Sequence, residues 1–317
     1  MLSVISYTTE EIAQLLKISK LTVYDLIKKG ELPSYRVGKQ MRVDASDLEA
    51  YKQRARTIPV SDAPAVVAPP AVRTPVAASP IGPRPIVITG HDIGLDILAK
   101  HLEKHIPGIR PLRSFVGSMD SLISMYRGES DIVSTHLLDG ETGQYNLPYI
   151  RRLLVGSPYL VVNLLSRTAG LYVQQGNPLG LTNWSDLGRP GLRLANREKG
   201  SGARVLLDEQ LRLHGIRADQ LIGYAQEHTN HLGVATQVAS GEADVGVGIE
   251  KAASLVGQID FIPMIQERYD LVMLKHADNL PWIQSLIQIL RSDAFRKELQ
   301  AIAGYDLSRT GEILLET

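Results

Sequence analysis

Apolar residues recur at helical spacing from position 12 onward, directly after Thr8 and Glu11, which have the spacing of a capping box. This pattern predicts a first helix from about Thr9 to Lys17. Ser19 is a preferred N-cap residue, and Gly30 is a residue that ends helices in a left-handed conformation. A second helix is therefore expected between Ser19 and Gly30. The short turn between the two helices is typical of a helix-turn-helix.

The spacing changes after the second helix. Between Leu32 and Val43, two short extended runs lie on either side of Gly38-Lys39, which predicts a β-hairpin, or wing. A third helix is expected to begin at Asp44 or Ser46 and to run to about Arg56. Residues 1–56 are thus predicted to form a small winged helix-turn-helix domain.

Charge supports contact of this domain with double-stranded DNA. Residues 1–56 carry ten Lys or Arg residues against seven acidic residues, a net charge of +3, whereas the whole chain has a formal charge of zero. Side chains of the second helix and of the wing could reach bases or phosphates. The candidate DNA-binding residues are Lys20, Thr22, Tyr24, Lys28, Arg36, Lys39 and Arg42. A basic face on a protein-binding module is the alternative.

Residues 57–85 contain eight prolines among Ala and Val, with little charge and no sustained period. This composition is typical of a semi-extended linker. The simplest role of such a linker is to let the head reorient relative to the remainder of the chain. A proline motif that binds a partner is the minor alternative.

Residues 86–317 repeat a unit of strand, polar turn and helix. The first unit begins at Pro85, with a buried strand that ends at Thr89 and helix-spaced apolar residues from Ile93 to Leu102. Such units predict an α/β sheet, in which ligands gather beyond the carboxyl ends of the strands. The turns at these ends comprise Thr89 to Asp92, Gly117-Ser118 and Ser134 to His136.

A Gly-Ser-Gly turn at residues 200–202 follows a predicted strand at 192–195 and precedes a predicted helix from Val205 to Leu213. Backbone N–H groups at a helix start favour an anion, and Arg197 or Arg204 could add charge-assisted hydrogen bonds. The spacing is not that of a Walker phosphate-binding loop. The alternative is a tight structural turn with surface arginines.

Composition excludes several classes of function. The chain has no cysteine, so disulfides and thiolate chemistry are unavailable. No window approaches eighteen uncharged apolar residues, and no signal peptide begins the chain, so we expect a cytoplasmic protein without a membrane span. There is no Gly-x-Ser-x-Gly elbow, and we expect no catalytic residues and no enzyme.

A metal site is the less favoured interpretation of several histidines and carboxylates, because no closely spaced motif joins them. The residues concerned are His91, Asp92, His136, Asp139, Glu227, His228 and His231. We therefore expect no metal ion and no cofactor. His231 is more simply interpreted as the start of a helix.

Two resemblances combine these observations. The stretch from Tyr7-Thr-Thr-Glu-Glu-Ile-Ala to Arg42-Val-Asp-Ala-Ser-Asp-Leu-Glu-Ala-Tyr resembles the excisionase-like winged helix-turn-helix family, which is related to mercury-resistance-type regulators. Residues 86–312 resemble the periplasmic-binding-protein-like domains that occur fused to such heads and are often grouped with molybdate-binding proteins. The matching motifs are His136-Leu-Leu-Asp139, Tyr145-Asn-Leu-Pro148, Gly176-Asn-Pro178, Asn196-Arg197, Gly200 to Asp208, Gly223-Tyr224, Glu227, His231, Val234-Ala, Gly241 to Gly248 and Tyr269-Asp-Leu-Val272.

The second resemblance implies an α/β fold of type II, with two lobes that close on a ligand and a second lobe at roughly residues 170–262. It implies molybdate or tungstate as the effector. By this analogy the ligand-binding residues are Thr89, Gly90, His91, Asp92, Ser118, Ser134, Thr135, His136, Asn196, Arg197, Ser201, Gly202, Arg204, Asn230, His231 and Tyr269. Asp92 and Asp139 are unexpected near an anion, which leaves an organic ligand with donor groups as an alternative.

Taken together, the sequence predicts a transcription regulator with a DNA-binding head at residues 1–56, a linker at 57–85 and a ligand-sensing body at 86–317. A single module buries little surface on DNA, so we expect a homo-oligomer. In the alternative, the body has lost its ligand and serves only as an oligomerisation scaffold.

Overall fold

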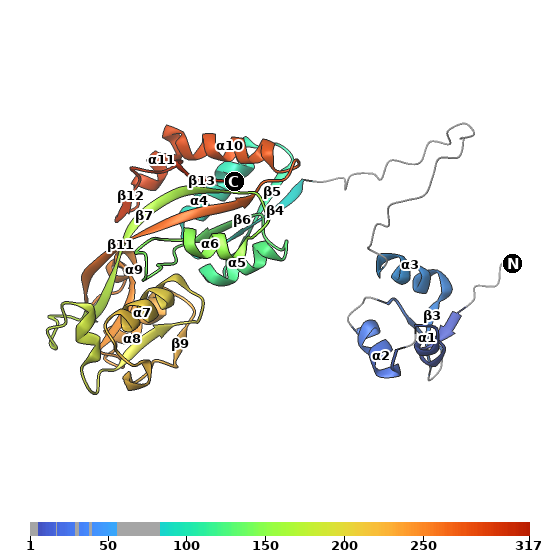
Figure 1. Cartoon of the computed structure of the whole chain (residues 1–317), viewed down its shortest axis with the longest axis horizontal. Coiled ribbons are helices and arrows are strands. Elements are labelled where there is room, and N and C mark those ends of the chain that lie inside the picture. The colour runs from blue at the N-terminus through green and yellow to red at the C-terminus, as the bar shows by residue number, and fades with distance from the viewer. Residues whose placement is uncertain (1–5, 17, 29–31, 38–39, 56–82) are drawn as a thin grey trace. The chain divides into compact units, whose positions relative to one another are not determined.

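The computed structural model describes residues 6–16, 18–28, 32–37, 40–55 and 83–317 (Figure 1). The chain divides into two compact units, residues 1–76 and 77–317. We refer to the first as the head and to the second as the body. The candidate DNA-binding residue Lys39 and almost all of the predicted linker lie outside the described residues. In the described part of the chain, none of the helices has the length and apolar character that a membrane crossing requires.

The helices of the head follow the predicted pattern. They are α1 (Thr9–Leu16), α2 (Lys20–Lys28) and α3 (Ala45–Ala55). The capping box is present, because the backbone N–H of Thr8 donates to the Glu11 carboxylate at 2.7 Å and the Glu11 N–H donates to the Thr8 hydroxyl at 3.3 Å. Ser19 caps α2 by accepting the N–H of Thr22 at 3.1 Å.

The sheet of the head has three strands rather than the two predicted. The wing consists of β2 (Tyr35–Val37) and β3 (Gln40–Asp44), which pair in an antiparallel manner. The additional strand, β1 (Ser6–Thr8), lies on the other side of β3. The helices pack on Ile12, Val23 and Leu48, all almost fully buried, which gives the head a hydrophobic core of its own.

The first lobe of the body contains a parallel group of strands, β5-β4-β6, extended by β11, β7 and the C-terminal strand β13. Helices α4, α10 and α11 cover one face of this sheet, and α5 and α6 lie on the other (Figure 1). The elements are β4 (Arg84–Thr89), α4 (Gly94–His105), β5 (Ile109–Ser114), α5 (Ser118–Tyr126), β6 (Ile132–Thr135), α6 (Leu147–Leu153), α10 (Leu280–Arg291), α11 (Asp293–Gln300), β12 (Tyr305–Asp306) and β13 (Ile313–Glu316).

The second lobe extends the same sheet through β10, β8 and β9. Helix α7 and the short helix η1 pack against one hydrophobic cluster, and α8 and α9 pack against another. Its elements are η1 (Trp184–Gly188), β8 (Leu194–Arg197), α7 (Gly202–Leu213), η2 (Ala218–Gln220), β9 (Glu227–His228), α8 (His231–Ala239), β10 (Val245–Ile249) and α9 (Glu250–Leu255). Helix α7 begins three residues before the predicted start at Val205, because Ser201 is its N-cap.

Two long strands join the lobes. β7 (Tyr159–Gln174) and β11 (Ile259–Leu274) are each 16 residues long and pair along almost their whole length. β11 pairs with β6 in the first lobe, whereas β7 pairs with β10 in the second. The register of the long pair shifts between Tyr269 and Asp270, as at a β-bulge. The lobes are therefore parts of one continuous sheet.

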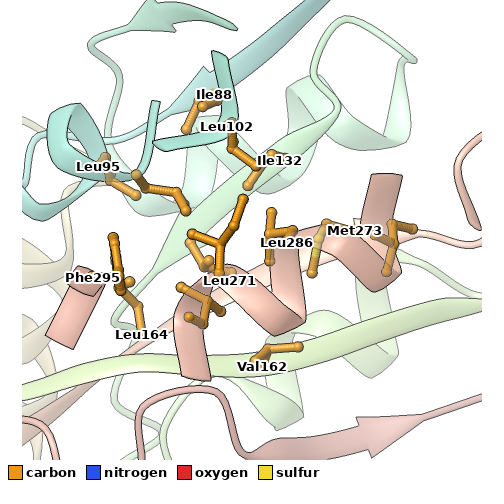
Figure 2. Close-up of a cluster of buried hydrophobic side chains, with 14 of the residues drawn as sticks. Ile88, Leu95, Leu102, Ile132, Val162, Leu164, Leu271, Met273, Leu286 and Phe295 are labelled. Atoms are coloured by element: carbon orange, nitrogen blue, oxygen red, sulfur yellow. The ribbon is translucent and has the colours of Figure 1, made fainter. Parts of the chain in front are cut away.

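The apolar core of the first lobe fixes the loops at the carboxyl ends of its parallel strands. Figure 2 shows Ile88 and Ile132 from the parallel strands in one cluster with Leu95 and Leu102 of α4, and Leu271 of β11 belongs to the same cluster. The side chains of Leu95, Leu98 and Leu102 are fully buried, at the spacing predicted for one helix face. The predicted fold class, α/β with a winged head and a two-lobed body, is confirmed.

Candidate functional site

A cavity of about 270 Å³ lies between the two lobes of the body. Its first-lobe side comes from the turn after β4, the N-terminus of α5 and the residue after β6. Its second-lobe side comes from the N-termini of α7 and α8 and from α9, and Arg167 of the crossing strand β7 also lines it. The sequence-predicted ligand residues that line it are Gly90, His91, Asp92, Ser118, His136, Arg197, Ser201, Gly202, Asn230, His231 and Tyr269.

The turn after β4 is closely packed around Gly90. Gly90 has a φ of +128°, and a Cβ atom there would lie 1.9 Å from the Ser134 hydroxyl oxygen. That hydroxyl donates to the Thr89 carbonyl at 2.7 Å and hydrogen-bonds with the Tyr269 hydroxyl at 2.8 Å. Only glycine fits both the conformation and the space, so the turn brings backbone close to the cavity.

Ser118, at the start of α5, holds the imidazole of His136. The Ser118 hydroxyl accepts the backbone N–H of His136 at 3.3 Å and lies 3.0 Å from its Nδ1. The His136 ring also stacks on Tyr269, with centroids 5.0 Å apart. His136 is thereby fixed at the boundary between the lobes.

Helices α7 and α8 are capped by side chains that line the cavity. The Ser201 hydroxyl accepts the Arg204 N–H at 3.3 Å, and the Asn230 side chain accepts the Gly233 N–H at 2.8 Å. The first N–H groups of a helix have no acceptor within that helix, and they carry a partial positive charge. Helices α7 and α8 of the second lobe and α5 of the first lobe therefore all begin at this cavity.

The lobes already touch beside this cavity. The N–H of Met119 in the first lobe donates to the Gly200 carbonyl in the second at 2.9 Å. A Cβ on Gly202 would lie 2.1 Å from the His136 ring. The structure therefore shows the body with its lobes in direct contact.

Arg167 forms the charged centre of the site. It is 4% exposed, and it pairs with Asp92 and with Glu267, whose side chains are each 2% exposed. Arg167 Nε donates to Glu267 at 2.5 Å, and Glu267 is its register partner across the β7–β11 pair. Burial raises the pKa of Glu267, although the adjacent guanidinium opposes that shift. Burial alone would lower the pKa of Arg167, but the two carboxylates raise it overall.

Asp92 is not free to repel an anion. Its Oδ1 accepts the N–H of Gly94 at 2.7 Å and the Tyr305 hydroxyl at 2.6 Å, and its Oδ2 accepts Arg167. Asp139, the other acidic residue of concern, lies in a separate surface groove with Glu209 and Arg212. Asp92 thus already accepts hydrogen bonds from donors of the protein, and Asp139 does not line the cavity.

Arg197 supplies a second buried guanidinium. It is 3% exposed and hydrogen-bonds through Nε and Nη2 to Glu198 and to the carbonyls of His228 and Thr229. Burial acts to raise the pKa of Glu198, but the hydrogen bonds from Arg197 hold that pKa below its usual value. Among the described residues, no partner is found for Nη1 of Arg197.

Three histidines line the cavity and are held neutral. The pKa of His136 and that of His231 lie well below 6.5 because of burial and then of the nearby charges of Arg167 and Arg197. Burial and Arg197 also lower the pKa of His91. Burial and the nearby guanidinium groups thus both favour the neutral imidazoles.

Five of the predicted ligand residues do not line the cavity. Ser134 hydrogen-bonds to the carbonyl of Thr89 beside Gly90 and so holds the turn in place. Thr135 donates to Asn146 at 3.2 Å, and Asn196 donates to the Tyr224 carbonyl at 2.9 Å. Arg204 stacks on the Tyr224 ring at 4.2 Å and pairs with Asp208 at 3.0 Å.

Sequence reasoning did not single out several lining residues. Arg167, Lys251 and Tyr305 line the cavity, as do apolar side chains from both lobes. A signal for Arg167 exists, because it is the only Lys, Arg, His, Asp or Glu in the mainly apolar stretch from Tyr159 to Val173. In the described parts of the chain, no three His, Asp or Glu side chains come together as a metal site.

On the head, the candidate DNA-contacting side chains of α2 are accessible. Thr22, Tyr24 and Lys28 are exposed, and Lys20 forms an ion pair with Glu10. On the wing, Arg36 is exposed, whereas Arg42 is half-buried and its Nη1 lies 3.2 Å from the Ser6 hydroxyl. Helix α2 therefore presents polar and basic groups to solvent, as a recognition helix requires.

Comparison with known proteins gives the family. A model of the PBP superfamily domain matches residues 99–291, and a model of a helix-turn-helix domain matches residues 6–56. The Bacillus subtilis (strain 168) protein YvgK, itself uncharacterized, is 50% identical over 316 residues, with 98% of each chain covered. The chain belongs to the PBP superfamily.

The solved structures similar to this PBP-domain protein are diverse. The ancestral amino acid-binding protein AncCDT-1 has a TM-score of 0.51 at 16% identity, over 69% of this chain and 95% of that chain. EhuB in complex with hydroxyectoine has a TM-score of 0.53 at 13% identity, over 72% and 93%. A hydrogen-peroxide-bound mutant of Corynebacterium glutamicum OxyR has a TM-score of 0.51 at 13% identity, over 93% and 90%. These similarities establish the fold.

Proposed function

We propose that this PBP-domain protein is a cytoplasmic, one-component transcription regulator. Its head binds double-stranded DNA, and its body binds a small anion in the cavity between the lobes. The observation that carries the ligand class is the lining itself. In the described part of the chain, it contains three cationic side chains, Arg167, Arg197 and Lys251, and a single carboxylate, Asp92, whose oxygens accept hydrogen bonds from donors of the protein.

Molybdate and tungstate are the first candidates within this class. Both are tetrahedral oxyanions that hydroxyl and backbone N–H groups can hold, and the cavity offers Ser118, Ser201 and the helix starts of α7 and α8. Their sizes and charges are nearly alike, so the site is expected to bind both.

Closure of the lobes would connect ligand to DNA. The contacts between Met119 and Gly200, and between the Gly140 N–H and Glu209 at 2.8 Å, exist only while the lobes are together. An anion that binds both lobes stabilises this arrangement, and only its greater affinity for the closed state can drive the change. No catalytic step is proposed.

We also propose that the protein acts as a homo-oligomer, because one small head buries too little surface on DNA for useful specificity. Sedimentation at micromolar concentration, with and without DNA, should show at least a dimer. A monomer under both conditions would contradict the proposal.

The direct test of the proposed function is a thermal-shift and calorimetry panel on the full chain with molybdate, tungstate, sulfate, phosphate and organic acids. An anion at a hundred times its dissociation constant should stabilise the body by about 2.7 kcal/mol. The binding anion should then change DNA affinity in an anisotropy titration. If no anion raises the unfolding temperature of the body, the proposed sensor function fails and the body is better interpreted as an oligomerisation scaffold.

Anion binding is expected to be coupled to proton uptake. A bound anion favours the charged imidazolium, so it raises the pKa of His91, His136 or His231 from the lowered value of the free protein. Affinity should therefore rise as the pH falls through the pKa of the bound state. Calorimetry near pH 6 in two buffers of different ionisation heat should detect uptake of a fraction of a proton, and little should remain near pH 8.

The matched variants for this test are His91→Gln, in the cavity, and His276→Gln, which is exposed and does not line it. The first should reduce proton uptake, and the second should leave it unchanged. Affinity that falls with falling pH would contradict an anionic ligand.

DNA binding by the head should depend on salt through a small number of phosphate contacts. Lys28→Ala and Arg36→Ala each remove an exposed positive charge from the predicted contact surface. Each should make the negative slope of log K against log salt shallower by about 0.9, measured with a short duplex of arbitrary sequence. Lys52→Ala, on α3, is the charge-matched control, and an equal change in its slope would argue against α2 and the wing as the contact surface.

A further inference from the structure

Three large apolar side chains belong to the solvent-exposed part of the cavity lining. Ile93, Leu232 and Leu255 line it and are 47%, 45% and 67% exposed to solvent. Because these side chains are both exposed and part of the lining, they lie at the opening of the cavity. Ile93 comes from the first lobe at the start of α4, whereas Leu232 and Leu255 come from α8 and α9 of the second lobe.

Several polar groups of the lining are buried. Ser118 and Ser201 are each 3% exposed and stand at the starts of α5 and α7, where the lobes touch. Arg197 is equally buried, and its Nη1 has no partner among the described residues. His231 likewise has a buried Nδ1 without a hydrogen-bond partner in the described structure. These buried groups could hold an anion away from bulk solvent.

An inorganic oxyanion held by these buried polar groups would leave Ile93, Leu232 and Leu255 exposed to water. Exposed large apolar side chains grouped at a binding cavity indicate a ligand that covers them, because apolar area removed from water is the main source of affinity for small organic ligands.

A zwitterionic amino acid is not favoured. Among the described residues of the lining, Asp92 is the only carboxylate, and both of its oxygens already accept hydrogen bonds from Gly94, Tyr305 and Arg167. A ligand ammonium group would therefore find no free carboxylate, and the three cationic side chains of the lining would repel it.

We propose that the ligand is a small organic monocarboxylic acid, with its carboxylate at the helix starts of α5 and α7 and its apolar part between Ile93, Leu232 and Leu255. This inference rests on the proposed anion-sensing function and narrows its ligand class. In this arrangement, the apolar part of the ligand would contact both lobes at once only when the lobes are closed.

A series of straight-chain carboxylates tests this on the full chain by calorimetry, with acetate, butanoate and hexanoate beside molybdate and tungstate. Each methylene that becomes buried should lower the dissociation constant about fourfold, until the cavity is full. An affinity independent of chain length overturns the inference. Binding of molybdate alone also overturns it and leaves the proposed function intact, whereas binding of none of these anions removes both.

Two surface variants identify the apolar contact. Leu255→Ser changes a largely exposed residue of the opening, so it should fold normally, and it should flatten the chain-length dependence with little effect on acetate. Leu213→Ser is the control, because Leu213 is 50% exposed on α7 but does not line the cavity. An unchanged chain-length dependence in Leu255→Ser, or an equal loss in Leu213→Ser, would refute the assignment.

Discussion

Arg167→Met is expected to lower the free energy of unfolding of the body by about 3–5 kcal/mol. The substitution removes the only cation of a buried cluster and leaves Asp92 and Glu267 as uncompensated carboxylates in side chains that are 2% exposed. A methionine has a similar volume, so the loss should come from charge rather than from a cavity. Urea unfolding of the full chain, monitored on the transition of the body, measures it.

The loss of unfolding free energy in Arg167→Met should become smaller as the pH falls. A carboxyl group whose pKa is raised in the folded state, as that of Glu267 is, favours folding while it is protonated and loses that advantage as the pH rises through its folded pKa. Without Arg167 the raised pKa should rise further, so the deficit of the variant at pH 8 should exceed that near pH 5.5. A deficit independent of pH would show that repulsion between buried carboxylates is not its cause.

Two further variants complete this prediction. Adding Asp92→Asn and Glu267→Gln to Arg167→Met should recover part of the lost stability, because neutral side chains of the same shape replace the buried charges. Arg217→Met is the control, since Arg217 pairs with Asp219 at the surface, with side chains 72% and 63% exposed. Its removal should change stability little.

Gly202→Ala is expected to hold the lobes apart and to weaken anion binding about 100-fold, which corresponds to a closed population of about 1%. A Cβ at this position would lie 2.1 Å from the ring of His136. The ring cannot move away cheaply, because Ser118 and Tyr269 hold it. Alanine is otherwise well tolerated in the first turn of a helix, so α7 should remain intact.

Lobe separation can be measured without the ligand. The chain contains no cysteine, so single cysteines at the exposed positions Glu129 and Glu242, one in each lobe, allow distance measurement by paired spin labels. Gly202→Ala should lengthen the distance, whereas Gly257→Ala, with no atom within 4 Å of the added Cβ, should not. Equal distances in parent and Gly202→Ala would show that this contact does not control closure.

Local signals in the sequence located much of the site. Ser201 and Asn230 are good helix caps followed by helical spacing, so their places at the starts of α7 and α8 follow from short-range chemistry. The turn at Gly90 follows from a buried strand that ends in glycine. Short-range patterns of this kind also placed the helices and the wing of the head.

Long-range contacts were beyond reach. Arg167 and Glu267 lie 100 positions apart and meet only through the register of β7 and β11, and no local pattern specifies that register. Arg204 shows the limit of a local signal. The helix start at Ser201 indicated that Arg204 lies near the cavity, but it did not specify the direction of the side chain, which packs on Tyr224. β1 was missed because a three-residue strand is too short to show a period.

The connectivity of the body also orders its assembly during synthesis. The sheet of the first lobe is built from strands near residue 84, from both crossing strands and from β13, whose register with Val162 and Leu160 is made by residues 313–316. The elements particular to the second lobe lie between these segments in the chain. Because the chain is synthesised from its N-terminus, every segment particular to the second lobe is made before the last strand of the first lobe, so the lobe that begins first is completed last.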